Sequence, residues 1–212
     1  MTIEQINGFW VPSHDAQIGD WRETGAPFVQ DKCLNYFTKY CLEKKIMLEN
    51  VLDIGAWCGT WSATMQKFAK KINCFEPNKV HFECLQKNLE GHQHIKTFNH
   101  AVGSENGYVK LSEESATQNT RVIQEKGDIP IFTVDSLKFE NVDMIKIDVE
   151  GLEMEVLKGA TNTLENVKYL MIELNNNSKK YGSSNREIEK YLHGLGFRVL
   201  IKVWPDIVYR KK

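Results

Sequence analysis

The sequence predicts an α/β fold in which a doubly wound, mostly parallel sheet carries an antiparallel hairpin at its C-terminal end. Three observations support this. Short apolar runs alternate with helical patterns from residue 51 to residue 102, as in β-α-β units, whose right-handed crossovers give parallel strands. Two further near-continuous apolar runs, 143–149 and 169–174, are typical of buried strands. Finally, a Trp-Pro-Asp turn joins two strand-like segments, 197–204 and 207–209, and this predicts the hairpin.

Length and composition favour one globular domain. The chain has 212 residues, of which 42% are hydrophobic, enough for a single sizeable core. Lys and Arg number 27 against 28 for Asp and Glu, so the net charge of −1 excludes the basic surface typical of nucleic-acid binding. No signal peptide and no apolar run near 18 residues is present, so we expect a cytoplasmic protein with no membrane partner. The oligomeric state stays open.

The five cysteines form no C-x-x-C pair, and their number is odd. We therefore expect reduced thiols in the core or in loops. These cysteines are Cys33, Cys41, Cys58, Cys74 and Cys84.

The N-terminal part differs from the rest. Residues 1–27 combine Phe9, Trp10 and Trp21 with glycines and prolines that forbid a long helix. They form either an arm that caps the core or a structural extension that packs on the sheet. Residues 28–48 predict a helix. We therefore divide the single domain into residues 1–48, an arm and helix, and residues 49–212, the main α/β part. The stripe of the helix that should face inward carries Leu34, Phe37, Cys41 and Leu42.

The alternating segment is predicted in detail as strand 51–54, helix 60–70, strand 72–75, helix 78–90 and strand 95–102. Gly91 closes the second of these helices.

After residue 102 the pattern changes. Asn106-Gly107 predicts a type I′ hairpin, because residues 101–102 and 109–111 on either side alternate in polarity. Residues 112–128 are polar and predict either a loop across the mouth of the sheet or a mobile insertion. Further on, the sequence predicts a strand at 131–134 and helices at 152–158, with Gly159 at C′, and at 184–194, with Ile188, Tyr191 and Leu192 inward.

A glycine loop follows the first strand of the alternating segment. Gly55 and Gly59 stand between strand 51–54 and the next helix, where a missing Cβ lets the backbone approach a ligand. Glu76 ends the next strand, 21 residues beyond Gly55, where a carboxylate holds a ribose diol in nucleotide-binding folds. Together they predict a cofactor that contains adenosine.

The kind of cofactor follows from what the loop lacks. The dinucleotide fingerprint needs three glycines, and its second glycine position is occupied by Trp57, whose indole would obstruct a pyrophosphate. No P-loop motif occurs, which disfavours ATP and GTP. A cofactor with ribose and adenine but no phosphate fits better, and this points to S-adenosylmethionine.

Several motifs together resemble the FkbM-type family of S-adenosylmethionine-dependent methyltransferases. The longest and most specific of them runs from Asp143 to Glu153 and continues to Ala160. The resemblance spans about residues 50–175. The other motifs are Val51–Ala56 with Gly59, Cys74–Asn78 with Leu85 and Asn88, and Ala101–Gly103.

The resemblance implies the class I methyltransferase fold, a Rossmann-like seven-stranded sheet whose last strand is antiparallel. It also implies site residues. Glu76 would hold the ribose hydroxyls, and Pro77 follows it in the same motif. Trp57 stands where the family usually has Asn, and we count it among the cofactor-binding residues. The methionine part would be surrounded by Asp53, Gly55, Ala56 and Gly59, and the adenine would be bordered by residues near Asn99 and Ala101.

The run 143–153 also supplies candidates for catalysis. Alternate strand residues share a face, so Lys146 and Asp148 project together, and Glu150 follows near the carboxyl end of the strand. Parallel sheets bind ligands at this end. Asp148 could therefore face the sulfonium or the acceptor, and Glu150 could orient or deprotonate a hydroxyl. The alternative is structural: a Lys146–Asp148 ion pair, with Glu150 stabilised at a helix N-terminus.

The remaining motifs give weaker indications of function. His92 and His94 lie in a polar turn, and we expect solvated histidines and no metal site. The Asn-Pro-Pro-Tyr signature of amino-group methyltransferases is absent, which favours a hydroxyl acceptor. The sequence thus predicts an O-methyltransferase acting on a sugar, a glycan or another small metabolite. Two alternatives stay open: a non-catalytic binding protein that kept the fold, and a nicotinamide-dependent reductase, which Trp57 disfavours.

Overall fold

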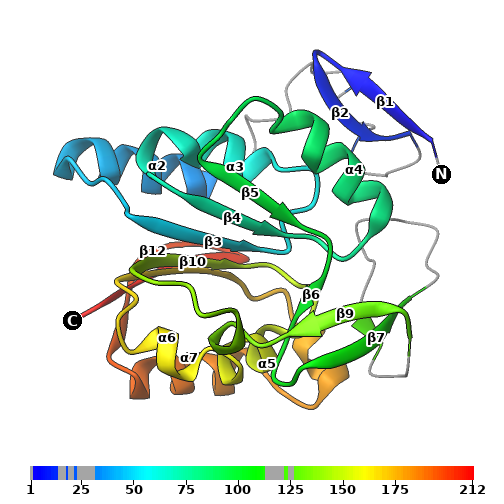
Figure 1. Ribbon diagram of the computed structural model, residues 1–212. Helices are drawn as coiled ribbons and strands as arrows, with labels where there is room; N and C mark the ends of the chain where they lie inside the picture. The colour runs from blue at the N-terminus through cyan, green and yellow to red at the C-terminus, as the bar shows by residue number, and fades with distance from the viewer. Residues whose placement is uncertain (1, 14–17, 19–21, 23–31, 113–121, 124–126) are drawn as a thin grey trace.

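A seven-stranded sheet forms the centre of the computed structural model, which describes residues 2–13, 18, 22, 32–112, 122–123 and 127–212 (Figure 1). The strand order is β12-β13-β11-β10-β3-β4-β5. β13 is antiparallel to both of its neighbours, and the other pairs are parallel. This confirms the predicted fold and its C-terminal hairpin. The strands are β3 (Asn50–Ile54), β4 (Ile72–Phe75), β5 (Ile95–Phe98), β10 (Val142–Ile147), β11 (Tyr169–Glu173), β12 (Phe197–Val203) and β13 (Asp206–Lys211).

Helices cover both faces of the sheet, so the structure has three layers (Figure 1). One face carries α2 (Lys32–Lys44), α3 (Thr60–Met65) and α4 (Lys79–Asn88), and their apolar sides meet the sheet in one buried cluster. A second cluster lies under the opposite face. It is covered by α5 (Glu153–Lys158), α6 (Thr161–Leu164) and α7 (Asn185–Gly194). Strands buried on both faces explain the near-continuous apolar runs in the sequence.

The predicted elements of this sheet agree closely with the structure, with small differences. The helix predicted over 60–70 is α3 followed by a 3₁₀ turn, η1 (Gln66–Phe68). Leu42 was wrongly assigned to the inner stripe of α2, because its side chain is 67% exposed. The buried side of the helix rotates instead towards Cys33, which together with Leu34, Phe37 and Cys41 is buried. In α7 the predicted inward residues Ile188 and Leu192 are buried.

A second, smaller sheet stands beside the main one and was not predicted. Its order is β6-β9-β7-β8. The predicted strand 95–102 is in fact two strands, because β5 ends at Phe98 and the chain crosses into the small sheet before Ala101. Two polar residues, Asn99 and His100, form the break. The strands are β6 (Ala101–Val102), β7 (Gly107–Leu111), β8 (Val122–Ile123) and β9 (Ile129–Phe132).

The hairpin predicted at Asn106-Gly107 is wrong. β6 and β7 do not pair with each other, since both pair with β9. The Asn106 side chain has another partner: its Oδ1 accepts hydrogen bonds from the Thr133 N–H and from Ser136 Oγ, at 2.8 and 2.9 Å. The type I′ geometry occurs instead at Asn7 and Gly8, with φ values of +50° and +84°.

That turn joins β1 (Ile3–Ile6) to β2 (Phe9–Pro12), and this N-terminal hairpin lies against α4 (Figure 1). The structural extension expected here therefore packs on a helix and not on the sheet. Most of residues 14–31 and of the polar segment 112–128 lie outside the described residues, so the predicted arm and loop there stay predictions.

Gly159 lies at the end of α5, but not in the left-handed C′ position predicted for it. Its φ is −77°. A Cβ at this position would lie 2.0 Å from the Gly103 carbonyl oxygen, so close approach of two backbones accounts for the glycine.

Two predictions from composition are also tested. All five cysteines are buried free thiols, as expected. In the part of the chain that the structure describes, no helix has both the length and the apolar character needed to cross a bilayer.

Candidate active site

The glycine loop after β3 packs directly against the chain that leaves β10. Gly55 has φ +78°, and a Cβ there would lie 1.7 Å from the Asp148 carbonyl oxygen. Ala56, which is buried, and Gly55 both donate their N–H groups to the Phe75 carbonyl oxygen at 3.0 Å. The loop is therefore fixed between β4 and β10 before any ligand arrives.

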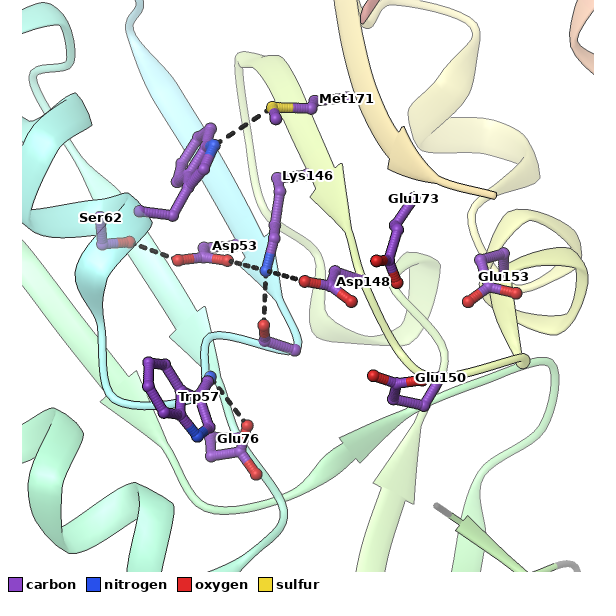
Figure 2. A network of polar contacts seen from close by, with 12 residues as sticks. Asp53, Trp57, Ser62, Glu76, Lys146, Asp148, Glu150, Glu153, Met171 and Glu173 are labelled. Carbon is purple, nitrogen blue, oxygen red and sulfur yellow. Dashed lines mark hydrogen bonds and ion pairs between the residues drawn. The ribbon is translucent and has the colours of Figure 1, made fainter. Parts of the chain in front are cut away.

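Lys146, a buried residue of β10, connects the glycine loop to Asp53 in β3 and to Asp148 (Figure 2). Lys146 Nζ donates to the Gly55 carbonyl oxygen at 2.5 Å and lies 3.2 Å from Asp53 Oδ1 and 3.4 Å from Asp148 Oδ2. Burial alone would lower the pKa of this ammonium, but the charges of Asp53 and Asp148 raise it above its ordinary value. Lys146 is thus a fixed cation with three acceptors.

Asp53, near the end of β3, contacts Lys146 of β10 and Ser62 of α3. The side chain is fully buried, and its Oδ2 accepts a 2.6 Å hydrogen bond from Ser62 Oγ. The sequence predicts a contact with the methionine part of the cofactor. Asp53 supports Lys146 and the first turn of α3, and its contact with the cofactor stays a prediction.

Glu76 stands at the carboxyl end of β4 and is 6% exposed. Its Oε2 accepts the Trp57 N–H and its Oε1 accepts the Asn78 N–H, both at 2.9 Å. His81 Nδ1 lies 3.5 Å from Oε1. A carboxylate oxygen has more than one lone pair, so both oxygens keep capacity for further donors such as ribose hydroxyls.

Three of the other predicted cofactor residues, Asn99, Ala101 and Gly59, are placed in the structure by contacts of their own. Asn99 Nδ2 donates to the carbonyl oxygens of Glu76 and Pro77, at 2.9 and 3.1 Å, so Asn99 holds the turn after β4 in place. Ala101 is buried in β6. Gly59, at φ +88°, precedes α3 and packs on Leu85.

An acidic cluster, formed by Asp148, Glu150 and Glu173, lies on the other side of the loop (Figure 2). One carboxylate oxygen from each lies within 4.8 Å of the others. The side-chain amides of Asn175 and Asn177 donate to Glu150 Oε2 at 3.2 and 2.8 Å, and Asn175 also donates to Glu173 Oε2 at 2.8 Å. The amides thus fix two of the three carboxylates.

Close packing of like charges changes the protonation of this cluster. Burial, together with the neighbouring charges of Asp148 and Glu150, raises the pKa of Glu173 to about 9. Burial and the charge of Asp148 also raise the pKa of Glu150, against the opposing effect of the two amides. Burial raises the pKa of Glu153, at the start of α5, to about 7. The site therefore contains carboxyl groups whose pKa values lie above the ordinary range of a carboxylic acid.

Two groups of side chains could bind a metal: the pair His92 and His94, and the acidic cluster. His92 and His94 are half-exposed, their rings 6.2 Å apart. The oxygen arrangement of the acidic cluster could hold a cation as well as a shared proton. The expectation of no metal site therefore stays a prediction.

Comparison with known proteins assigns the chain to a family. The sequence profile of the methyltransferase FkbM domain matches residues 16–199, well beyond the part in which the motifs are readable. The chain belongs to the FkbM methyltransferase family. This confirms the family that the motifs resemble, a family of S-adenosylmethionine-dependent methyltransferases.

Two relatives illustrate the match to the FkbM family. Hexuronic acid methyltransferase AglP of Haloferax volcanii is 28% identical over 130 residues, which cover 58% of this chain and 54% of that protein. The FkbM methyltransferase structure from Methylobacillus flagellatus has a TM-score of 0.57 at 17% identity and covers 77% of this chain and 43% of its own. The chain thus spans about half the length of these relatives.

The fold is shared more widely. N-methyltransferase NodS of Bradyrhizobium japonicum, solved with S-adenosylhomocysteine, has a TM-score of 0.56 at 11% identity and covers 95% of this chain and 93% of its own. At this identity the likeness concerns the fold alone.

The residues of this FkbM-family site fit an adenosyl sulfonium cofactor by their chemistry. Glu76 offers a nearly buried carboxylate to a diol at one side of the loop. On the other side, Asp148, Glu150 and Glu173 provide acidic groups suited to a positive charge. The cation at the loop, Lys146, already has three acceptors, so it is not available for a pyrophosphate.

Sequence reasoning missed several residues of this FkbM-family site. Glu173 had a signal, because it is an acidic residue at the carboxyl end of an apolar strand, but the strand order that places it beside Asp148 was not readable. His81 had only a weak signal within the helix pattern. Its ring is buried 6.4 Å from that of Trp57, and its Nε2 has no hydrogen-bond partner among the described residues.

The raised pKa of Glu173 predicts a pH dependence of stability. A carboxyl group whose pKa rises from 4.5 to about 9 on folding binds an extra proton in the folded state. The free energy of unfolding should therefore fall as the pH rises from about 5 to 9, by up to about 1.4 kcal/mol per pH unit for one proton. The Glu173→Gln variant should show a flatter profile in urea unfolding at several pH values.

The matched control for this prediction is Glu165→Gln, which removes an exposed carboxylate at the end of α6. Its profile should follow that of the unchanged protein. Equal slopes in all three proteins would mean that Glu173 does not take up the proton.

Proposed function

We propose that this FkbM-family protein transfers the methyl group of S-adenosylmethionine to a hydroxyl group of a sugar. The observation that carries the proposal is the acidic cluster, Asp148, Glu150 and Glu173, placed beside the glycine loop at the carboxyl ends of β10 and β11. Open α/β sheets bind their ligands at this edge. A methyltransferase that acts on hydroxyls needs a proton acceptor there, and these carboxylates supply it.

When bound, S-adenosylmethionine supplies an electrophilic methyl group on a positively charged sulfur. Glu76 and the backbone of the glycine loop would hold it. Glu150 would accept the proton of the acceptor hydroxyl, because its raised pKa lies closer to neutral pH, where a general base works best. Asn175 and Asn177 hold its Oε2 in place.

Asp148 has a different environment from Glu150. Its Oδ2 faces the Lys146 ammonium at 3.4 Å. We therefore assign Asp148 the role of a carboxylate held in place by Lys146, which orients the reacting groups and faces the sulfonium.

Two observations favour a sugar acceptor. AglP, a relative in sequence, is a hexuronic acid methyltransferase. The net charge of −1 also offers no general attraction for a nucleic-acid backbone. A hydroxyl is favoured over a carboxylate acceptor, because the site offers a proton acceptor, which methyl transfer to a carboxylate does not need.

The test combines binding and turnover. Calorimetry should show that the purified protein binds S-adenosylhomocysteine. Mass spectrometry should then find methylated product after incubation with S-adenosylmethionine and a panel of hexuronic acids, their oligosaccharides and neutral sugars. Parallel reactions with EDTA and with Mg²⁺ ask whether the acidic cluster needs a cation.

The outcomes separate the alternatives. A folded protein that fails to bind S-adenosylhomocysteine would overturn the proposal, and a thermal shift with NADH would then revive the reductase. Binding without turnover on the whole panel would favour a non-catalytic binding protein. Methylation of a carboxylate or an amine would refute the hydroxyl assignment.

Glu76 gives a sharper prediction about the cofactor. In the Glu76→Ala variant, S-adenosylhomocysteine should bind more weakly by about 1–3 kcal/mol, because the buried partners of the carboxylate lose their acceptor. Calorimetry on this variant and on Glu76→Gln, which keeps one oxygen acceptor, measures the effect. The Gln variant should fall between the two. An unchanged affinity in Glu76→Ala would place the ribose elsewhere.

A further inference from the structure

One side-chain amide joins the N-terminal hairpin to the glycine loop. Asn88, at the end of α4, accepts the Trp10 N–H at 2.6 Å through its Oδ1. Its Nδ2 donates to the carbonyl oxygens of Trp10 at 2.7 Å and of Cys58 at 2.9 Å. Both donor hydrogens of the amide and its oxygen are therefore used. The three segments lie up to 78 residues apart in sequence.

Apolar packing reinforces this connection. Phe9 and Val11 of the hairpin are buried in one cluster with Cys58 of the loop and Cys84 of α4. The Trp57 side chain packs against the same cluster. The hairpin is thus in contact with the loop through side chains as well as through the amide.

The backbone at this point of the loop is strained. Trp57 has φ +48°, a left-handed conformation that is unfavourable for a bulky residue by about 1–2 kcal/mol. Such a conformation persists where the surrounding structure determines it. The Trp57 N–H donates to Glu76 Oε2 at 2.9 Å, and the next carbonyl oxygen, that of Cys58, accepts from Asn88. The strained residue is therefore held from both sides.

We propose that Asn88 is a positioning residue for cofactor binding, acting through the Trp57–Cys58 backbone. It fixes the Cys58 carbonyl oxygen to the hairpin, so that the Trp57 N–H stays directed at Glu76 and the loop keeps one conformation before the cofactor binds. A site that is ordered in advance binds its ligand more tightly, because less conformational freedom is lost on binding. This inference rests on the proposed cofactor.

Through Asn88, the N-terminal hairpin also has a role in cofactor binding. The hairpin of β1 and β2 is far from Asp148 and Glu150 in the sequence, and its proposed contribution to the enzyme is to hold the loop. It acts on cofactor affinity and leaves the acidic cluster unchanged. Changes at Asn88 should therefore alter the affinity for the cofactor and leave the turnover of bound substrate unchanged.

The experiment compares Asn88→Asp with the unchanged protein. Aspartate has the size of asparagine but lacks both donors, so a carboxylate would face the carbonyl oxygens of Trp10 and Cys58. The dissociation constant for S-adenosylhomocysteine should rise about 10-fold in calorimetry. Hydrogen exchange of the unliganded protein should become faster at residues 56–59. The less disruptive Asn88→Ala, which adds no charge, should show both effects if the Asp variant does not fold.

A matched control is Asn73→Asp. Asn73 is another hydrogen-bonded side-chain amide, buried in β4. It donates to Asn50 Oδ1 at 2.8 Å and contacts neither the hairpin nor the loop through that bond. The Asn73→Asp variant should unfold at a lower temperature than the unchanged protein and bind S-adenosylhomocysteine with the same affinity. A structural role for Asn88 alone would give the same result as this control, and that outcome would overturn the inference.

Failure of the inference and failure of the proposed function remain distinguishable. If the unchanged protein does not bind S-adenosylhomocysteine, the cofactor assignment fails. Exchange at residues 56–59 in the unliganded variants still reports on the loop in that case. Unchanged exchange there, or unchanged affinity in a folded Asn88 variant, refutes the positioning role.

Discussion

In the Lys146→Met variant, the free energy of unfolding should fall by about 3–5 kcal/mol at neutral pH. The physical reason is the state of Asp53 after the change. Asp53 is fully buried, and the Lys146 ammonium lies 3.2 Å from its Oδ1, an atom with no hydrogen-bond partner among the described residues. Removing the cation leaves this charge buried and uncompensated. Urea unfolding measures the loss through the midpoint and the slope.

Two further variants control this prediction. The double variant Lys146→Met, Asp53→Asn removes both charges and should recover part of the loss, because an amide still pairs with Ser62. Lys70→Met breaks an ion pair with Glu49 whose side chains are 58% and 52% exposed, and it should cost less than about 1 kcal/mol. A loss below about 1 kcal/mol in Lys146→Met would show that Lys146 does not compensate the buried Asp53 carboxylate.

Much of this site could be predicted from the sequence, because its residues lie at the ends of apolar strands. The runs ending at Ile54, Phe75 and Ile147 are short, largely apolar and buried along their whole length, as expected for strands covered on both faces. The polar residues that follow each run must therefore lie at one edge of a parallel sheet. This places Glu76 and Asp148 at the site without any knowledge of the strand order.

What could not be predicted depends on contacts between distant segments. Asn106-Gly107 has the local signature of a turn, but Thr133 and Ser136, 27 and 30 residues further on, donate to the Asn106 side chain. The link from Asn88 to Trp10 likewise joins residues 78 positions apart. Glu173 joins the acidic cluster because β11 pairs with β10. Local patterns carry no information on such pairings.

Trp57 illustrates both what the sequence predicts and what depends on contacts between distant segments. Asparagine, the residue usual in the family at this position, tolerates the left-handed conformation well. The sequence alone shows that a bulky residue replaces it in a cofactor loop. The structure adds that this residue keeps φ +48° and packs on the hairpin cluster of Phe9, Val11, Cys58 and Cys84. The substitution and the N-terminal hairpin are therefore physically connected.

The largest effect on turnover is expected at Glu150. In the Glu150→Gln variant, kcat for a methylated acceptor should fall about 10²–10⁴-fold, the usual contribution of a general base. S-adenosylhomocysteine affinity should stay nearly unchanged, because Glu76 and the loop are intact. Gln keeps the size of the side chain and one oxygen acceptor for Asn175 and Asn177. The comparison therefore isolates proton acceptance.

The pH–rate profile distinguishes Glu150 from its neighbours. Burial and the charge of Asp148 raise the pKa of Glu150, so activity should increase with pH through a limb above the ordinary range of a carboxylic acid. Asp148→Asn removes the second of these causes and should move that limb to lower pH. The control Glu155→Gln, on α5 with its carboxylate paired to Lys158 at 2.7 Å, should leave kcat and the limb in place. If Glu150→Gln keeps its kcat while Asp148→Asn loses it, Asp148 is the base.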